Sequence, residues 1–187
     1  MTRTPTSLLD PVPLHSAVQF ALEQARQHGA TAAEAAASQG QGLSVNVRMG
    51  EIETIEHTRD RGLVVTVYLG QKMGSASTAD YGLASVAEIV EAACNIARHI
   101  EDDVCNGLPD VDDLATTFPD LDLYHPWRPS VDDALDAALV CEQAALDWDQ
   151  RIENSEGASV STHETLGVYG NSLEFIAENR KTRHGIS

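Results

Sequence analysis

The residues that come nearest to a metal-dependent catalytic motif are 163–167 (HETLG). A zinc peptidase of the zincin type needs two histidines four residues apart on a helix, so that both rings reach one ion while Glu acts on its water. Here Gly167 stands where the second histidine would be. The flanking residues also alternate as in a strand, where positions four apart lie roughly 13 Å from each other. We therefore predict that this segment holds no zinc.

Two further patterns could suggest a metal, and neither fits. A calcium loop starting at Asp110 would need Gly five residues later and Glu eleven residues later, but Ala115 and Leu121 stand there. The histidines other than His163 share no ligand spacing, and we expect surface or interface positions for them. These histidines are His15, His28, His57, His99, His125 and His184. The prediction is that this chain contains no metal ligand and no catalytic residue.

Two short segments combine amides, hydroxyls and glycines at expected strand ends, namely residues 154–157 (NSEG) and 169–172 (YGNS). Such groups can hold an extended peptide that adds to a sheet as a further strand. The same residues are ordinary turn formers, and turn formation is the interpretation we favour. Peptide binding stays open as the alternative. Its candidate residues are Asn154, Ser155, Glu156, Tyr169 and Asn171.

The elements that would position these residues begin with a β-meander over residues 45–80. Val45, Val47 and Met49 alternate with polar residues, which is typical of a strand with one buried face. Turns are expected at residues 50–51, 60–62 and 70–71, which separate strands at 44–49, 52–58, 63–69 and 72–78. An earlier strand is possible over residues 32–38.

Helical periodicity flanks this meander on both sides. One helix is expected from Ser16 to a stop at Gly29, and another over residues 85–100, where Ser85 and Glu88 have the spacing of a capping box. Two helices on one face of an antiparallel sheet predict the α+β class.

The second half of the chain changes character. Residues 101–129 are acidic and rich in proline, which favours a connector. A third helix should start at Ser130, and a second meander should follow from about residue 151, with a turn at residues 170–171. The pattern still reads as a strand at Ser187, so we expect a longer protein. The predicted divisions are a flexible arm (1–15), an N-terminal α+β domain (16–100), the connector (101–129) and the incomplete start of a central domain (130–187).

The composition excludes several classes of function. Lys and Arg number 12 against 29 Asp and Glu, which gives a net charge of −17. Such a surface repels phosphate backbones and anionic lipid, so neither nucleic acid nor a membrane is an expected partner. No apolar run approaches the roughly 18 residues of a membrane span, and no signal peptide is evident. A cytoplasmic location is therefore expected.

Residues 50–78 (GEIETIEHTRDRGLVVTVYLGQKMGSAST) closely resemble the N-terminal sheet motif of the PmbA/TldE family. The resemblance continues through residues 92–98 (AACNIAR), 119–127 (PDLDLYHPW) and 154–161 (NSEGASVS). It covers the chain from about Ser16 to Ser187.

This resemblance implies a function that the residues alone do not. Members of the family pair with a TldD subunit, and the heterodimer cleaves flexible peptides, such as leader peptides and an antitoxin. The zinc and the His-Glu-x-x-x-His motif belong to the TldD subunit, so this chain would bind no cofactor itself. It would be the N-terminal portion of a TldE-like subunit. The alternative is a stand-alone adaptor that captures peptides at its sheet edges.

Overall fold

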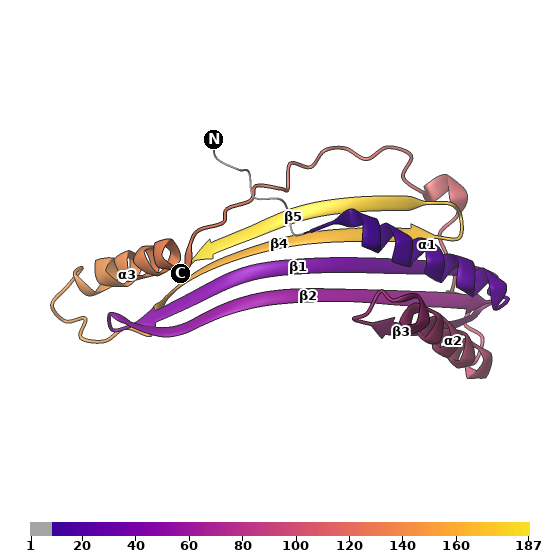
Figure 1. Ribbon diagram of the computed structural model, residues 1–187, viewed down its shortest axis with the longest axis horizontal. Coiled ribbons are helices and arrows are strands. Elements are labelled where there is room, and N and C mark those ends of the chain that lie inside the picture. The colour runs from indigo at the N-terminus through magenta and orange to yellow at the C-terminus, as the bar shows by residue number, and fades with distance from the viewer. Residues whose placement is uncertain (1–8) are drawn as a thin grey trace. The chain divides into compact units, whose positions relative to one another are not determined.

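The computed structural model describes residues 9–187, which form helices and one sheet of five strands (Figure 1). The strand order is β3-β2-β1-β4-β5. The elements in chain order are α1 (Pro11–Gln27), β1 (Ala32–Arg48), β2 (Glu51–Leu69), β3 (Lys72–Thr78), α2 (Leu83–His99), the 3-10 helix η1 (Val111–Asp113), α3 (Val131–Leu146), β4 (Ala158–Asn171) and β5 (Ile176–Ile186). The predicted α+β class, with helices on one face of an antiparallel sheet, is confirmed. None of the helices in this described part is both long and apolar enough to cross a membrane.

The strands are longer than their sequence pattern predicts. The turn expected at residues 60–62 is wrong, because β2 runs unbroken from Glu51 to Leu69 and Gly62 does not adopt a positive φ. The expected turns at Gly50 and Gly70 are present, and both glycines have positive φ (76° and 64°). The turn expected at 170–171 lies slightly later, since β4 ends at Asn171. Residues that favour a turn do not force one. Where the chain can pair with a long neighbouring strand, that pairing outweighs the local turn preference.

The helix ends differ from expectation at two places. Helix α1 begins at Pro11, so the flexible arm predicted over 1–15 is wrong for its last residues; residues 1–8 lie outside the described residues. Proline is favoured in a first helical turn, and Asp10 caps the helix by accepting a hydrogen bond from Val12 N (3.0 Å). The capping box expected at Ser85 is also wrong, because α2 starts at Leu83 after an uncapped Gly82.

The cap expected at Ser130 is confirmed. The Ser130 hydroxyl accepts a hydrogen bond from Asp133 N (3.1 Å), and the Asp133 carboxylate accepts one from Ser130 N (3.2 Å). This reciprocal pair satisfies two amides that the first turn of α3 would otherwise leave without partners. The sequence alone was enough to predict this cap, because Ser130 and Asp133 lie within one helical turn of each other.

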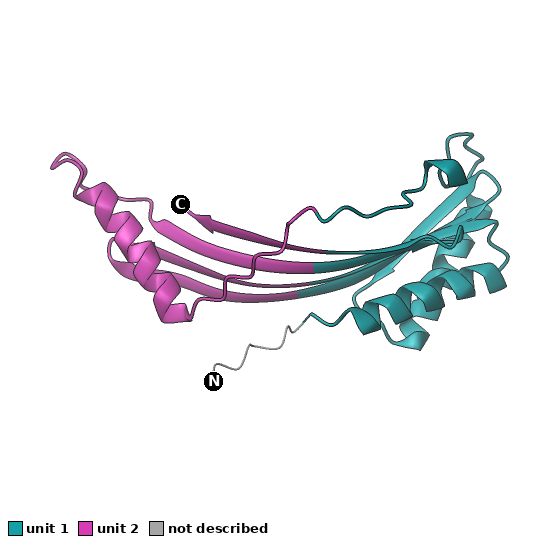
Figure 2. Ribbon diagram, turned by 90° about the horizontal axis from the view of Figure 1, so that it is seen from above, with its two compact units in different colours: residues 1–39, 60–120, 166–179 teal, residues 40–59, 121–165, 180–187 magenta. Residues whose placement is uncertain are grey.

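Two compact units divide the chain differently from the predicted domains (Figure 2). Unit 1 contains residues up to 39, 60–120 and 166–179, and unit 2 contains residues 40–59, 121–165 and 180–187. Each unit combines residues from both sides of the connector, because β4 and β5 join the sheet that β1 to β3 begin. The boundaries at 16–100, 101–129 and 130–187 stay a prediction.

Each unit has its own apolar core. In unit 1, α1 and α2 pack on alternate residues of the sheet, so that small Ala33, Ala35 and Ala37 lie beside buried Leu63 and Val65. In unit 2, Ala134 and Ala138 of α3 pack on Val45 and Val47. The alternation predicted for Val45 and Val47 therefore marks the face that α3 covers. Met49, which was expected on the same buried face, is instead 49% exposed, because it lies in the turn after β1.

A buried carboxylate closes the β1–β2 turn in unit 2. Glu142 of α3 is 3% exposed and accepts hydrogen bonds from Met49 N (2.8 Å) and Gly50 N (2.9 Å). The bond from Gly50 is the first cause of the lowered pKa of Glu142. Since both turn residues have positive φ, their amides point toward one acceptor, and Glu142 supplies it.

We predict that Gly74→Ala destabilises the protein. A Cβ at Gly74 of β3 would lie 2.0 Å from Ala93 O and 2.6 Å from Ala97 N of α2, which are backbone atoms that cannot move aside cheaply. The expected loss in free energy of unfolding is about 3 kcal/mol. The matched control is Gly62→Ala in β2, where a Cβ meets nothing within 4 Å. Chemical denaturation of both variants tests this, and equal effects would contradict it.

Candidate functional site

The His163-Glu164 pair lies in strand β4 and not on a helix. The ring of His163 lies over β1, where a Cβ on Gly42 would be 2.8 Å from His163 Nδ1 and one on Gly40 would be 3.0 Å from His163 Nε2. The two glycines therefore make room for this ring. Glu164 is 3% exposed and shares its strand face with buried Val160 and Leu166.

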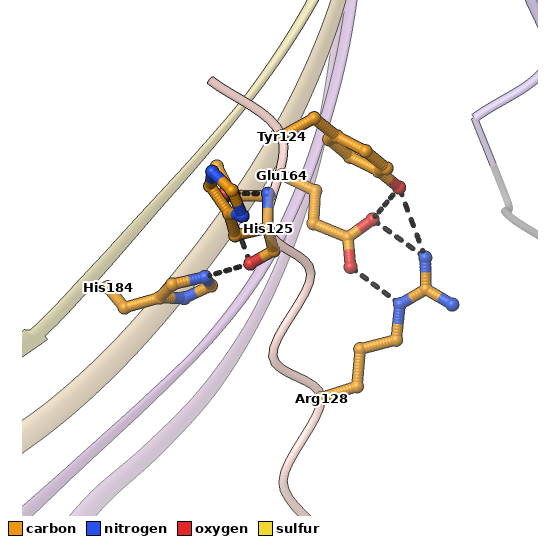
Figure 3. Close-up of polar contacts among 6 residues, drawn as sticks. Tyr124, His125, Arg128, Glu164 and His184 are labelled. Carbon is orange, nitrogen blue, oxygen red and sulfur yellow. Dashed lines mark hydrogen bonds and ion pairs between the residues drawn. The ribbon is translucent and has the colours of Figure 1, made fainter. Parts of the chain in front are cut away.

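The buried carboxylate of Glu164 is the centre of a polar network in unit 2 (Figure 3). Arg128 of the connector donates two hydrogen bonds to it, from Nε to Oε1 (2.6 Å) and from Nη2 to Oε2 (2.9 Å). The Tyr124 hydroxyl donates a third to Oε2 (3.3 Å) and accepts one from Arg128 Nη2 (3.4 Å). This is the two-pronged geometry in which guanidinium binds carboxylate most strongly.

The electrostatics fix the protonation of this network. The Arg128 hydrogen bonds hold the pKa of Glu164 below its usual value, although burial acts in the opposite direction. The same contact raises the pKa of Arg128. Glu164 is therefore ionised near neutral pH, and its side chain is 4% exposed against 30% for Arg128. A carboxylate held in this way is a poor general base, because taking up a proton would break an ion pair.

A second set of contacts places the connector along the outer side of β5. Thr182 N donates to Leu123 O (2.9 Å), and His125 N donates to Thr182 Oγ1 (2.9 Å). His184 Nε2 lies 2.8 Å from His125 O, so this nitrogen carries the proton and donates it to the carbonyl. The Trp127 ring meets His184 edge-on, with 5.7 Å between ring centroids. His125 and His184 thus help to hold the connector against β5.

Sequence reasoning missed Tyr124 and Arg128 as partners of Glu164. The available signal was a charged residue at an inward-facing position between Val160 and Leu166, because a buried carboxylate needs a partner. The sequence does not say which arginine provides it. Within residues 9–187, no three His, Cys, Asp or Glu side chains come close enough together to hold a metal ion.

Three of the predicted peptide-binding residues lie in unit 2, in the segment before β4. Ser155 O accepts a hydrogen bond from Arg48 Nε (3.2 Å), and its hydroxyl accepts one from Gly157 N (2.8 Å). Glu156 lines a cavity of about 210 Å³ with Glu53. Asn154 precedes these residues in the same irregular segment. The bond to Gly157 is a turn contact, as the favoured interpretation expects.

The other two predicted residues lie in unit 1, at the end of β4. Tyr169 donates a hydrogen bond to Glu34 (2.7 Å), which also accepts one from Tyr68 (3.0 Å). Burial and the nearby Glu34 raise the pKa of Tyr68 to about 12. Asn171 is 2% exposed and its Oδ1 accepts from Leu173 N (3.0 Å), which forms a turn. The structure therefore divides the candidates between the two units, and peptide binding by them stays a prediction.

Comparisons with known proteins point to one family. The model for the PmbA/TldA metallopeptidase domain 1 matches residues 33–97, and the model for the PmbA/TldA metallopeptidase central domain matches residues 124–187. A metalloprotease PmbA homolog of Haemophilus influenzae is 45% identical, and metalloprotease PmbA of Escherichia coli O157:H7 is 42% identical. Both alignments run over 174 residues and include 93% of this chain. This chain spans only 38% of the length of those relatives.

Solved structures share the fold. A putative modulator of DNA gyrase from Bacteroides thetaiotaomicron superposes with a TM-score of 0.76 at 20% identity, over 92% of this chain and 39% of that one. TldE from Thermococcus kodakarensis superposes with a TM-score of 0.74 at 14% identity, over 91% of this chain and 38% of that one. At these identities the likeness concerns the fold alone.

We predict that Glu164→Gln lowers the free energy of unfolding by about 2 kcal/mol, because it leaves the guanidinium of Arg128 without its anionic partner. The figure lies below that of a fully buried pair because the Arg128 side chain is 30% exposed. Exposed Glu153 in the same unit provides the control, Glu153→Gln. Urea denaturation measures both, and a Glu164→Gln variant as stable as its control would contradict the prediction.

The same pair should make stability depend on pH. The folded-state pKa of Glu164 is lower than its usual value of 4.5, so its contribution is present above that pH and is lost as pH falls through the folded value. We expect the difference in stability between the parent protein and Glu164→Gln to shrink below about pH 4.5. Thermal melts across the acid range test this. A constant difference would show that the charge of Glu164 does not matter.

Proposed function

This chain belongs to the PmbA/TldA metallopeptidase family, and we propose that it forms the non-catalytic first and central domains of a TldE-like subunit. In this proposal it pairs with a TldD-like subunit in the cytoplasm. The partner supplies the zinc and the reactive centre, and this chain helps to enclose the flexible peptide that is cut. Leader peptides and antitoxin-like segments are the proposed substrates.

The observation that carries this proposal is the structural role of Glu164, the acidic residue of the His-Glu pair. In a zincin, Glu must stand beside a metal-bound water, with both histidines on one side of a helix. Here Glu164 lies in a strand and its carboxylate is held by Arg128 and Tyr124. The sequence that comes nearest to a peptidase motif thus stabilises the fold, which supports a reactive centre outside this segment.

A second candidate function is favoured by a different observation. Strand β3 pairs with β2 only from Leu63 to Leu69, which leaves the half of β2 before Gly62 without a neighbour on that side within the described residues. An extended peptide can add to such an edge through main-chain hydrogen bonds. The alternative is therefore a stand-alone adaptor that captures peptides without any protease.

One set of measurements separates the two functions. We expect the purified chain to contain no stoichiometric zinc by elemental analysis, to leave an unstructured peptide uncut, and to be retained by an immobilised TldD-like subunit. Stoichiometric zinc or turnover by the chain alone would contradict the proposal. Tight peptide binding without retention by the TldD-like subunit would favour the adaptor.

A further inference from the structure

The first half of β2 is a strand edge that no other strand covers within residues 9–187. Residues Glu51 to Arg61 are all exposed, and they include Ile52 (55%) and Ile55 (43%). With β3 ending its pairing at Leu63, the outward N–H and C=O groups of this half meet no strand within residues 9–187. A long exposed edge of this kind is a template for pairing with another strand.

The opposite edge of the sheet, formed by β5, is partly covered by the connector. In unit 2 the connector lies along β5, through the bond from Thr182 N to Leu123 O and the contact between His184 and His125 O. A strand edge covered in this way cannot accept a further strand at those residues. The fold therefore blocks one edge locally and leaves β2 available.

The open edge carries an ordered charge pattern. Successive strand residues point to opposite faces, so alternate residues share one face. One face carries, in order, Glu51, Glu53, Ile55, His57, Arg59 and Arg61. Thr54 belongs to the other face, where it contacts Asn46 of the neighbouring β1. The first face is thus acidic at one end, basic at the other end, and uncharged or weakly basic between them.

We propose that this edge pairs with the same edge of a second copy, in antiparallel orientation. In the register that places Glu51 opposite Arg61, Glu53 lies opposite Arg59 and Ile55 lies opposite His57. The two-fold symmetry repeats each pairing, so every acidic residue on this face meets an arginine of the other copy. Opposite charges directly across two strands stabilise the pairing, and like charges there destabilise it. A parallel copy would instead bring like charges together.

Two features oppose this pairing: a like-charge contact on the second face of β2, and the negative net charge of each copy. On that face Thr54 lies opposite Thr58, and Glu56 lies opposite its own copy at the symmetry axis, which is the one like-charge contact of this register. Each copy also carries a net charge of −17. Repulsion between exposed charges is screened over about 8 Å at physiological salt, so contacts at the edge decide the outcome there. Moderate salt is therefore the condition for the test.

The experiment is a charge exchange measured by sedimentation equilibrium of the whole chain at about 0.15 M salt. We expect the parent chain to form dimers. Glu53→Arg and Arg59→Glu should each raise the dimer Kd roughly tenfold or more, because each creates two like-charge contacts per dimer. The variant with both substitutions should recover dimer formation. An equal mixture of the two single variants should also form dimers, since each supplies the charge that the other lacks.

The matched control is Glu91→Arg, at an exposed position of α2, which changes the net charge as Glu53→Arg does but alters no residue of β2. It should leave the Kd unchanged. A parent chain that stays monomeric up to about 1 mM, or dimers indifferent to the edge charges, would overturn the proposal. Capture of a peptide by a monomer would do the same and would assign the edge to the peptide. None of these outcomes depends on zinc or on retention by a TldD-like subunit, so this inference and the proposed function can fail separately.

Discussion

The buried carboxylate of Glu164 constrains the path of the connector through unit 2. Glu164 lies on the inward face of β4 at 3% exposure, where an unpaired charge would cost several kcal/mol. The fold satisfies it with the fork of Arg128 and the hydroxyl of Tyr124, both from the connector. The connector must therefore cross this face, and its path is then fixed along β5 by Leu123, His125 and Thr182.

This arrangement has consequences for function. A carboxylate committed to Arg128 is not available to activate water, so the likeness of residues 163–167 to a peptidase motif is confined to sequence letters. The path of the connector also blocks part of the β5 edge, whereas the first half of β2 stays open. Within the described residues, Glu164 therefore stabilises the fold, and the first half of β2 is the edge that another strand could reach.

Local signals in the sequence predicted the elements well where their partners are close in the chain. The cap at Ser130, the turns at Gly50 and Gly70 and the buried alternation of Val45 and Val47 all follow from neighbouring residues. The turn at residues 60–62 was wrong because long strand pairing outweighs local turn preference. The joining of β4 to β1, and the pairing of Glu164 with Arg128 across 36 positions, depend on residues far apart. No periodicity reveals such partners.

The most direct test is a double-mutant cycle between Glu164 and Arg128, with each changed to Gln alone and together, and unfolding followed in urea. We predict a coupling free energy of about 1–3 kcal/mol, because each side chain stabilises the fold through the other. Effects that add to within about 0.5 kcal/mol would contradict this. They would show that Glu164 does not owe its place in the fold to Arg128, and would leave its carboxylate free for another role.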